Sequence, residues 1–261
     1  MPKQQHWAII LGGSSGLGWA TAQKLAAEGY HLCLVHRDPR ARRKQAETAF
    51  AELRDQTGVQ LLHYNQDALR EDIRTDIVND LKNQMDGGKV RVLVHSIARG
   101  NLKLMLNPDG PSLATQDFEL TTQAMALSFY EWTKTLLQAE LFAPTASAIG
   151  FTSEGSYKAW PNYAAVSVAK ASLEALIKNM AAEFAPHGLR TNGIQAGVTD
   201  TPSLRMIPGS ELLKARSIER NPFQRLTHPE DVANAVYLLC LPEANWINGA
   251  IIPVDGGERL R

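Results

Sequence analysis

A glycine-rich turn near the start of the chain offers the first chemistry. It follows the apolar run 7–11 and leads directly into a stretch with helical spacing. Glycines let the backbone turn tightly and approach a phosphate, and unpaired N–H groups at a helix start attract its charge. The residues that would surround this phosphate are Gly12, Ser14, Ser15, Gly16, Leu17 and Gly18. Many strand–helix turns carry glycine for geometry alone, but the position after a first strand favours dinucleotide binding.

The end of the next apolar run, 31–35, carries the side chains that would contact the ribose of the dinucleotide. An acidic residue there would accept a hydrogen bond from the 2′-hydroxyl of NAD. His36 and Arg37 occupy the position instead, and a guanidinium can bind a 2′-phosphate through two hydrogen bonds. These residues predict NADPH as the cofactor, with NADH as the alternative. The other interpretation is a solvated surface pair, because Asp38 and further arginines follow.

Tyr163 and Lys170 are the candidate pair for carbonyl chemistry. Positions seven apart on an α-helix differ by about 700°, or nearly two turns, and by about 10 Å along the axis. Both side chains would therefore share one helix face, although an ordinary amphipathic helix can carry the same two residues. Ser153 precedes Lys170 by 17 positions. Its hydroxyl could assist at a carbonyl or could satisfy backbone groups at the end of a strand.

Short apolar runs and longer helical stretches alternate along the chain. Strands are expected over residues 7–11, 31–35, 59–64, 90–94, 146–151, 189–196 and 251–254. Helices are expected over residues 17–28, 39–53, 70–85, 113–140 and 163–184. Strands separated by such helices need right-handed crossovers and a parallel sheet covered on both faces. We expect one α/β domain over residues 1–261, a Rossmann-type doubly wound parallel sheet of about seven strands.

The stretch 197–221 is expected to be irregular, and a loop of that length is typical of a substrate lid. We place the lid at about 198–221. Its apolar residues could cover an acyl chain: Leu204, Met206, Ile207, Leu212 and Leu213. Its basic residues could steer an acidic carrier protein: Arg205, Lys214, Arg216 and Arg220. The interleaved Glu211 and Glu219 favour an ordinary solvated helix face instead.

Composition excludes several classes of protein. The 27 basic and 27 acidic residues balance, so charge alone predicts neither a nucleic acid nor an anionic membrane as partner. No apolar run is long enough to span a membrane, and the first six residues lack the apolar stretch of a secretion signal. A cytoplasmic protein is expected, with Cys33 and Cys240 as reduced core thiols. The histidines show no ligand spacing, so no metal site is predicted.

Several motifs together resemble the short-chain dehydrogenase/reductase family over nearly the whole chain. Gly12-x3-Gly16-x-Gly18 is similar to its nucleotide fingerprint. The segment 196–201 is similar to the part that holds the nicotinamide carboxamide, and 254–257 resembles the C-terminal signature. The resemblance implies further cofactor contacts from Asp67, Ala68, Ser96, Ile97, Ala98, Lys170, Gly197, Val198 and Thr201.

Two departures resemble the enoyl-acyl-carrier-protein reductase branch of that family. The segment 95–98 reads His-Ser-Ile-Ala where most members carry Asn-Asn-Ala-Gly. Tyr163-x6-Lys170 replaces the usual Tyr-x3-Lys, because position 166 is Val166. Gln123 stands near the position of the family's helix asparagine. The glycine turn, by contrast, is nearer the ordinary ketoreductase pattern.

This resemblance implies NAD(P)H-dependent reduction of the C2–C3 double bond of a trans-2-enoyl thioester, as in fatty acid biosynthesis. Hydride would enter at C3, Tyr163 would hydrogen-bond the developing enolate oxygen, and Lys170 would hold the nicotinamide ribose. The carrier would be acyl carrier protein, with coenzyme A as the alternative, and the enzyme a homotetramer. A 3-oxoacyl or other ketone reductase is the competing function, which Ser153 and the glycine turn favour. A protein that binds NADP(H) without turnover is the third.

Overall fold

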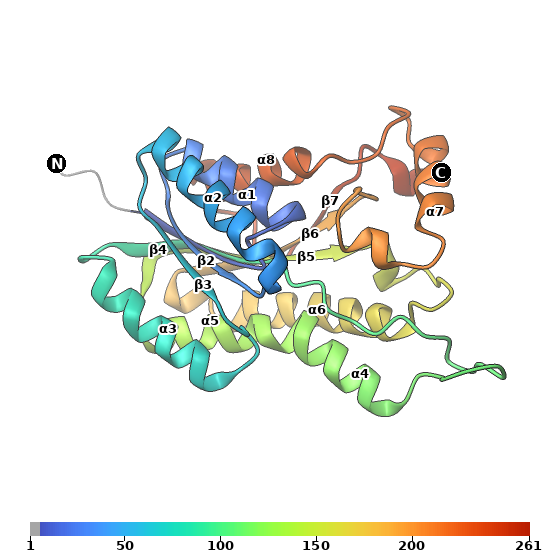
Figure 1. The fold of residues 1–261 in the computed structure, drawn as a ribbon. Helices are drawn as coiled ribbons and strands as arrows, with labels where there is room; N and C mark the ends of the chain where they lie inside the picture. Colours follow the sequence, from blue (N-terminus) through green and yellow to red (C-terminus); the bar gives the residue numbers. More distant parts are fainter. Residues whose placement is uncertain (1–5) are drawn as a thin grey trace.

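Seven parallel strands form one sheet in the computed structural model, which describes residues 6–261 (Figure 1). In chain order they are β1 (His6–Leu11), β2 (His31–His36), β3 (Leu61–Asn65), β4 (Lys89–His95), β5 (Phe142–Ser153), β6 (Leu189–Ala196) and β7 (Ile251–Val254). Their order in the sheet is β3-β2-β1-β4-β5-β6-β7, so the direction of winding reverses between β1 and β4. The expected seven-stranded, doubly wound parallel sheet is confirmed.

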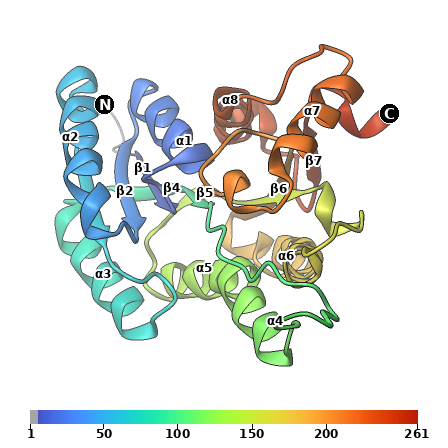
Figure 2. The same ribbon diagram turned by 45° about the vertical axis from the view of Figure 1, so that its right-hand side comes forward.

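Eight α-helices accompany the sheet within the described residues. They are α1 (Gly16–Ala27), α2 (Arg40–Thr57), α3 (Glu71–Gln84), α4 (Thr115–Thr122), α5 (Ser128–Gln138), α6 (Ala164–Glu183), α7 (Ser210–Arg220) and α8 (Pro229–Cys240). Figure 2 shows α1, α2 and α8 on one face of the sheet and α3, α5 and α6 on the other, with α4 beside α6. Each face therefore has its own hydrophobic core.

Strand β1 contributes to both cores because successive side chains of a strand point to opposite faces. Ile9 and Leu11 pack into the core that includes Phe129 of α5 and Leu173 of α6. Ile10 packs into the core that includes residues of α1, α2 and α8. Burial on both faces explains why this strand reads as a continuous apolar run rather than an alternating one.

Two helices near the end of the chain differ from the expectation. The stretch 197–221 is irregular only in its first half, because it contains a 3₁₀ turn, Leu204–Met206, and then α7. The prediction of an irregular lid was wrong for its second half. Helix α8 was not expected at all, although Pro229 at its first turn and the acidic Asp231 that bonds the His228 N–H are ordinary helix-start signals.

A π-helical turn, Gln123–Leu127, interrupts the long helix expected over 113–140. It joins α4 to α5 and buries Ala124, Met125 and Ala126. Single π turns inside α-helices are frequent at functional sites. Here the turn lies at the cavity described below, because Met125 lines it.

Cys33 and Cys240 are buried and unpaired, as expected for core thiols. No helix within residues 6–261 is both long enough and apolar enough to cross a membrane. Residues 1–5, which carry most of the segment considered for a secretion signal, lie outside the described residues.

Candidate active site

A cavity of about 1350 Å³ lies over the carboxyl ends of the strands and spans the point where the sheet order reverses. Doubly wound folds bind ligands in this crevice because the strand order leaves the connecting segments diverging there. All the predicted site residues except Gly18 line it. The topology therefore brings together side chains and backbone that are spread over residues 12–201.

The glycine turn forms one wall of the cavity and leaves no room for a side chain at Gly12 or Gly18. Gly12 adopts φ +81°, and a Cβ atom there would lie 2.5 Å from the Ser96 carbonyl oxygen. Gly18 does not line the cavity, but a Cβ atom on it would lie 2.2 Å from the Gly12 carbonyl oxygen. Ser15 caps α1 without a side-chain hydrogen bond. The turn therefore fits a pyrophosphate bound through backbone N–H groups.

At the end of β2, the two residues predicted to contact the ribose differ in exposure. The Arg37 side chain is 61% exposed, lines the cavity and donates to Asp67 at 3.0 Å. Asp67 also lies 3.5 Å from the Arg99 guanidinium. The His36 side chain, by contrast, is buried and is hydrogen-bonded to Asp38. Only Arg37 of the pair offers an exposed charge at this end of the cavity.

Tyr163 and Lys170 both line the cavity, but they belong to different local structures. Helix α6 begins at Ala164, and Tyr163 is its N-cap residue with φ −111° and ψ 0°. The Tyr163 carbonyl still accepts a hydrogen bond from the Ser167 N–H at 2.8 Å. The prediction that Tyr163 lies inside the helix was therefore wrong by one residue. Its side chain leaves from the end of the helix that faces the cavity.

Burial controls the charge of both groups. Desolvation lowers the pKa of Lys170 to about 8, and the nearby carboxylate of Glu174 opposes this shift. The Lys170 ammonium donates to the Phe151 carbonyl at 2.5 Å, which leaves two of its three donor positions for other partners. Burial raises the pKa of Tyr163 above its usual value. At neutral pH the site therefore holds a protonated phenol and a charged but partly desolvated lysine.

Ser153 lies at the end of β5, beside the Tyr163 phenol. Its Oγ is buried and forms no hydrogen bond of ordinary geometry within the described residues, although its proximity opposes the rise in the pKa of Tyr163. The interpretation of Ser153 as a strand-end serine predicts a bond to a backbone group, which is not observed. The hydroxyl therefore faces the Tyr163 phenol and the cavity, where both groups can donate to a bound carbonyl.

Two other polar residues near the cavity are structural. His95 is buried, and burial lowers its pKa to about 3, so the ring is neutral. Its Nε2 lies 2.8 Å from the Ser128 Oγ on α5. The Gln123 amide donates to Glu131 at 3.0 Å and does not line the cavity. Gln123 therefore does not take a place in the site comparable to that of Tyr163 or Lys170.

The lid closes the other side of the cavity. Its lining residues are Val198, Thr199, Thr201, Pro202, Ser203, Leu204, Met206, Ile207 and Leu213. Leu212, expected among them, is exposed and does not line the cavity. The apolar part of the lid can cover a hydrocarbon chain, as expected.

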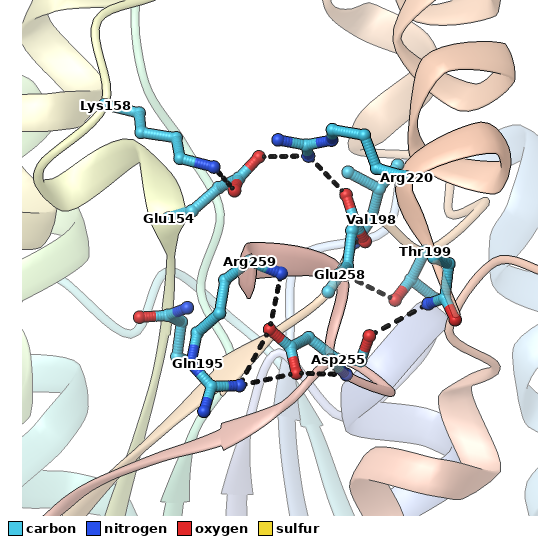
Figure 3. A network of polar contacts seen from close by, with 12 residues as sticks. Glu154, Lys158, Gln195, Val198, Thr199, Arg220, Asp255, Glu258 and Arg259 are labelled. Atoms are coloured by element: carbon cyan, nitrogen blue, oxygen red, sulfur yellow. Dashed lines mark hydrogen bonds and ion pairs between the residues drawn. The ribbon is translucent and has the colours of Figure 1, made fainter. Parts of the chain in front are cut away.

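Ion pairs occupy most of the basic residues of the lid. Arg205 pairs with Asp200 at 2.9 Å, and Lys214 pairs with Glu211 at 2.6 Å. Arg220 joins Glu154 at 2.8 Å and Glu258 at 2.6 Å, as Figure 3 shows. These pairs leave few unpaired basic residues for a rim that could steer a carrier protein, but only the Arg205 pair is exposed on both sides, whereas Glu258 is buried.

Further residues, which the sequence analysis did not predict as site residues, also line the cavity. They are, among others, Asp38, Arg42, Arg99, Met125, Glu154, Lys158 and Trp160. Arg99 directly follows the His-Ser-Ile-Ala segment, and residues 154–160 lie between Ser153 and Tyr163. The sequence could have indicated Arg99 and residues 154–160 only by their closeness to predicted site residues.

Known proteins resemble this chain over nearly its whole length. A family model described as Enoyl-(Acyl carrier protein) reductase matches residues 12–258. The chain is 27% identical to the tropinone reductase homolog At2g29340 of Arabidopsis thaliana, over 96% of this chain and 78% of that protein. It is 26% identical to the enoyl-[acyl-carrier-protein] reductase [NADH] FabI of Aquifex aeolicus (strain VF5), over 97% of this chain and 91% of that one.

A crystal structure of the enoyl-[acyl-carrier-protein] reductase (NADH) from Aquifex aeolicus VF5 has the same fold. Its TM-score is 0.84 at 23% identity, covering 99% of this chain and 98% of that one. The relatives' names thus cover more than one reaction, while the family match spans almost the whole chain. The chain belongs to the short-chain dehydrogenase/reductase family of oxidoreductases, in the group that the Enoyl-(Acyl carrier protein) reductase model describes.

Proposed function

We propose that the protein reduces the C2–C3 double bond of trans-2-enoyl thioesters with NADPH. The observation that carries this proposal is the position of the phenol. Val166, where a Tyr-x3-Lys enzyme has its tyrosine, lines the cavity, and the phenol comes instead from the N-cap of α6. In an enoyl thioester the charge develops on an oxygen two carbons from the carbon that receives hydride. A phenol displaced from Lys170 by two helical turns suits that separation.

The cavity residues fit a nicotinamide dinucleotide. The glycine turn would hold the pyrophosphate, Arg37 and Arg42 the 2′-phosphate, and Asp67 the adenine end. Ser96, Ile97, Ala98, Gly197, Val198 and Thr201 would surround the nicotinamide half. A reduced nicotinamide bound there supplies a hydride. NADPH is favoured over NADH by the exposed guanidinium of Arg37.

Tyr163 donates a hydrogen bond to the thioester oxygen, where negative charge develops during the reaction. Burial keeps the phenol protonated, because it raises the pKa of Tyr163. Lys170 adds positive potential from inside the cavity and can bind ribose hydroxyls through the donor positions that Phe151 does not use. Water or Tyr163 then supplies the proton at C2.

The acyl chain would lie against Met125 and the apolar part of the lid. We propose acyl carrier protein as its carrier, with coenzyme A as the alternative. The family resemblance supports this choice more than the charge of the lid does, because Arg205, Lys214 and Arg220 are already paired.

We also propose a homotetramer. Three large apolar side chains are exposed on neighbouring helices: Leu120 of α4, Leu127 of the π turn and Val168 of α6. Exposed apolar side chains on helices that pack together favour a subunit interface over scattered surface residues. Size-exclusion chromatography with light scattering tests the assembly.

Reduction of a 3-oxoacyl thioester or another ketone is the second candidate. The unpartnered, buried hydroxyl of Ser153 beside the phenol favours it, because two donors at one carbonyl suit direct ketone reduction. Binding of NADP(H) without turnover is the third candidate.

The test measures oxidation of the nicotinamide with a trans-2-enoyl thioester and, separately, a 3-oxoacyl thioester. Each substrate is offered on acyl carrier protein and on coenzyme A, with NADPH and with NADH. Tyr163→Phe removes only the phenol oxygen. Tyr157→Phe is the matched control, because Tyr157 is exposed and does not line the cavity.

We expect turnover of the enoyl substrate, reduced about 100-fold or more by Tyr163→Phe and little by Tyr157→Phe. Preference for the 3-oxoacyl substrate would replace the proposal by the second candidate. Binding of NADPH without turnover of either substrate would support the third.

A further inference from the structure

We propose that His36 sets the preference for NADPH by holding the carboxylate of Asp38 away from the cofactor ribose. The inference rests on the proposed function, because it requires a nicotinamide dinucleotide in the cavity. His36 would act only through Asp38, as a positioning residue. It therefore explains how a chain with an acidic residue at the ribose end could still accept a 2′-phosphate.

Asp38 lies where an acidic side chain would exclude that phosphate. It lines the cavity together with Arg37 and Arg42. A carboxylate facing a ribose accepts a hydrogen bond from the 2′-hydroxyl, whereas it repels a 2′-phosphate. Asp38 would thus favour NADH if its side chain were free to turn toward the ligand.

The carboxylate of Asp38 is not free. Its side chain is only 8% exposed, and its Oδ2 lies 2.9 Å from the His36 Nδ1. The backbone of Asp38 is fixed too, because its N–H donates to the Asn65 Oδ1 at 2.9 Å and its carbonyl accepts from the Asn65 Nδ2 at 3.2 Å. Side chain and backbone are therefore both tied to the ends of β2 and β3.

The surroundings of His36 fix its ring in the position that bonds Asp38. It is the last residue of β2, its side chain is 1% exposed, and its ring packs edge-on against Phe50 at a centroid distance of 5.3 Å. Burial is the main reason that the pKa of His36 is lowered, so the ring is neutral at neutral pH. A carboxylate can only accept, so Nδ1 carries the hydrogen of this bond.

The other nitrogen of the His36 ring, Nε2, takes part in no similar hydrogen bond within the described residues. This atom is buried and has no hydrogen-bond partner in that part of the chain. Burying an unpartnered polar atom costs free energy, and an apolar residue of similar size would avoid that cost. The bond from Nδ1 to Asp38 is thus what a histidine provides at this position and a phenylalanine would not.

With Asp38 held back, the charge offered to the ribose is positive. The Arg37 guanidinium is exposed, and its bond to Asp67 spans the surface of the cavity, where it can exchange for a phosphate. Arg42 lies on the first turns of α2 and also lines the cavity. The same two arginines would be partly neutralised if Asp38 turned toward them.

The test compares direct binding of NADPH and NADH by isothermal titration calorimetry. The variants are His36→Phe, Asp38→Asn and the double variant. Phenylalanine keeps a ring of similar size beside Phe50, and the melting temperature of the variant shows whether the fold is kept. His63→Phe is the matched control, because His63 lies beside the His36 ring at a centroid distance of 5.8 Å but forms no hydrogen bond with Asp38 in the part of the chain that the structure describes.

We expect His36→Phe to lower the ratio of NADPH to NADH affinity about 10-fold, from repulsion between a freed carboxylate and the phosphate. Adding Asp38→Asn should restore the ratio. Asp38→Asn alone should raise it less than about twofold, because the carboxylate is already held away. The control should leave the ratio as it is.

Three outcomes would overturn the inference. One is an unchanged ratio in folded His36→Phe, and another is a lowered ratio that Asp38→Asn does not restore. The third is a large rise in NADPH preference from Asp38→Asn alone, which is measurable even if His36→Phe fails to fold. A wild-type protein that binds neither dinucleotide would refute the proposed function as well. Failure of enoyl reduction with binding intact would leave the inference standing.

Discussion

The two sides of the cavity are held in place by different means. The turn side, Gly12–Gly18, is backbone packed against backbone, with carbonyl oxygens at distances that exclude a Cβ atom. The lid side, residues 198–221, is held by ion pairs between elements far apart in the chain, such as Arg220 with Glu154 and Glu258. One side is fixed by steric exclusion and the other by charge.

This difference separates the wall that would hold the pyrophosphate from the wall whose apolar residues would cover the acyl chain, although Val198 and Thr201 at the start of the lid would also contact the nicotinamide half. A backbone wall offers the same N–H groups whatever the surrounding side chains are, so it suits an invariant pyrophosphate. A wall built from side chains can be rebuilt residue by residue to suit another acyl group. The following predictions test whether the two sides respond to substitution as differently as they are built.

Gly18→Ala should produce the largest effect. The added Cβ would lie 2.2 Å from the Gly12 carbonyl oxygen, so the turn must shift. We expect the affinity for NADPH to fall about 100-fold or more, measured by calorimetry. Gly58→Ala is the control: Gly58 has φ +71° with open space around it, so it should cost about 1 kcal/mol of stability and no affinity. Equal effects of the two variants on NADPH binding would contradict steric exclusion as the cause.

Arg220→Met should come next, and it acts on the lid side. It leaves the Glu258 carboxylate, which is 3% exposed, without its guanidinium partner. We expect a loss of about 2 kcal/mol in the free energy of unfolding, less than for a fully buried pair because Arg220 itself is partly exposed. The KM for the thioester should rise several-fold while the affinity for NADPH stays the same.

Urea denaturation and steady-state kinetics measure these two effects of Arg220→Met. Arg216→Met is the matched control, because Arg216 is exposed on the same helix and forms no ion pair within residues 6–261. A weaker affinity for NADPH in Arg220→Met would mean that the two sides of the cavity are coupled after all.

A smaller effect on activity is expected from raising the pH. Because the pKa of Lys170 is about 8, activity should decline above that pH as the ammonium loses its charge. Glu174→Gln should move the decline to lower pH, since the Glu174 carboxylate raises this pKa. Glu183→Gln, at the exposed end of α6, is the control. An upward shift in Glu174→Gln, or activity that stays level beyond pH 10, would contradict this role.

The contribution of Lys170 to the free energy of unfolding should increase with pH over the range in which activity declines. Lys170 has a lower pKa in the folded chain, about 8, than the usual lysine value of 10.5 that it has in the unfolded chain. Between these values the unfolded chain binds the extra proton, so this group's contribution to stability increases as the pH rises. Unfolding measured across that window would separate loss of charge at the site from loss of structure.

Arg205→Gln should have the smallest effect. Its pair with Asp200 is exposed on both sides, and exposed pairs contribute little to stability. We expect no measurable change in melting temperature and less than about a twofold change in KM. A large rise in KM for the carrier-protein substrate, without one for the coenzyme A thioester, would instead identify Arg205 as part of a carrier-binding rim.

The fold and the turn side of the site could be predicted because their determinants are local. The buried run that contains Ile9 and Ile10, followed by the spaced glycines, specifies both a strand and the turn after it. The same holds for β2, whose apolar run ends at His36 and Arg37.

The rest depends on contacts that sequence spacing does not reveal. Tyr163 lies outside α6 because its own backbone, at φ −111° and ψ 0°, is not helical and follows Asn162 at φ +63°, so the helix begins one residue later than expected. Helix α7 gains its anchor from residues 66 and 38 positions away from Arg220. The burial of His36 likewise depends on its neighbours on α2 and β3, so sequence alone could not separate its role from that of Arg37.

The π turn between α4 and α5 has a consequence for helical wheels. Each residue of an α-helix advances the side-chain direction by about 100°, and a π turn holds one residue more than an α turn. A single wheel drawn through residues 115–138 therefore misplaces every side chain after Leu127 by about one such step. Deleting one residue of Gln123–Leu127 would rotate α5 by that angle and turn Ser128 away from His95.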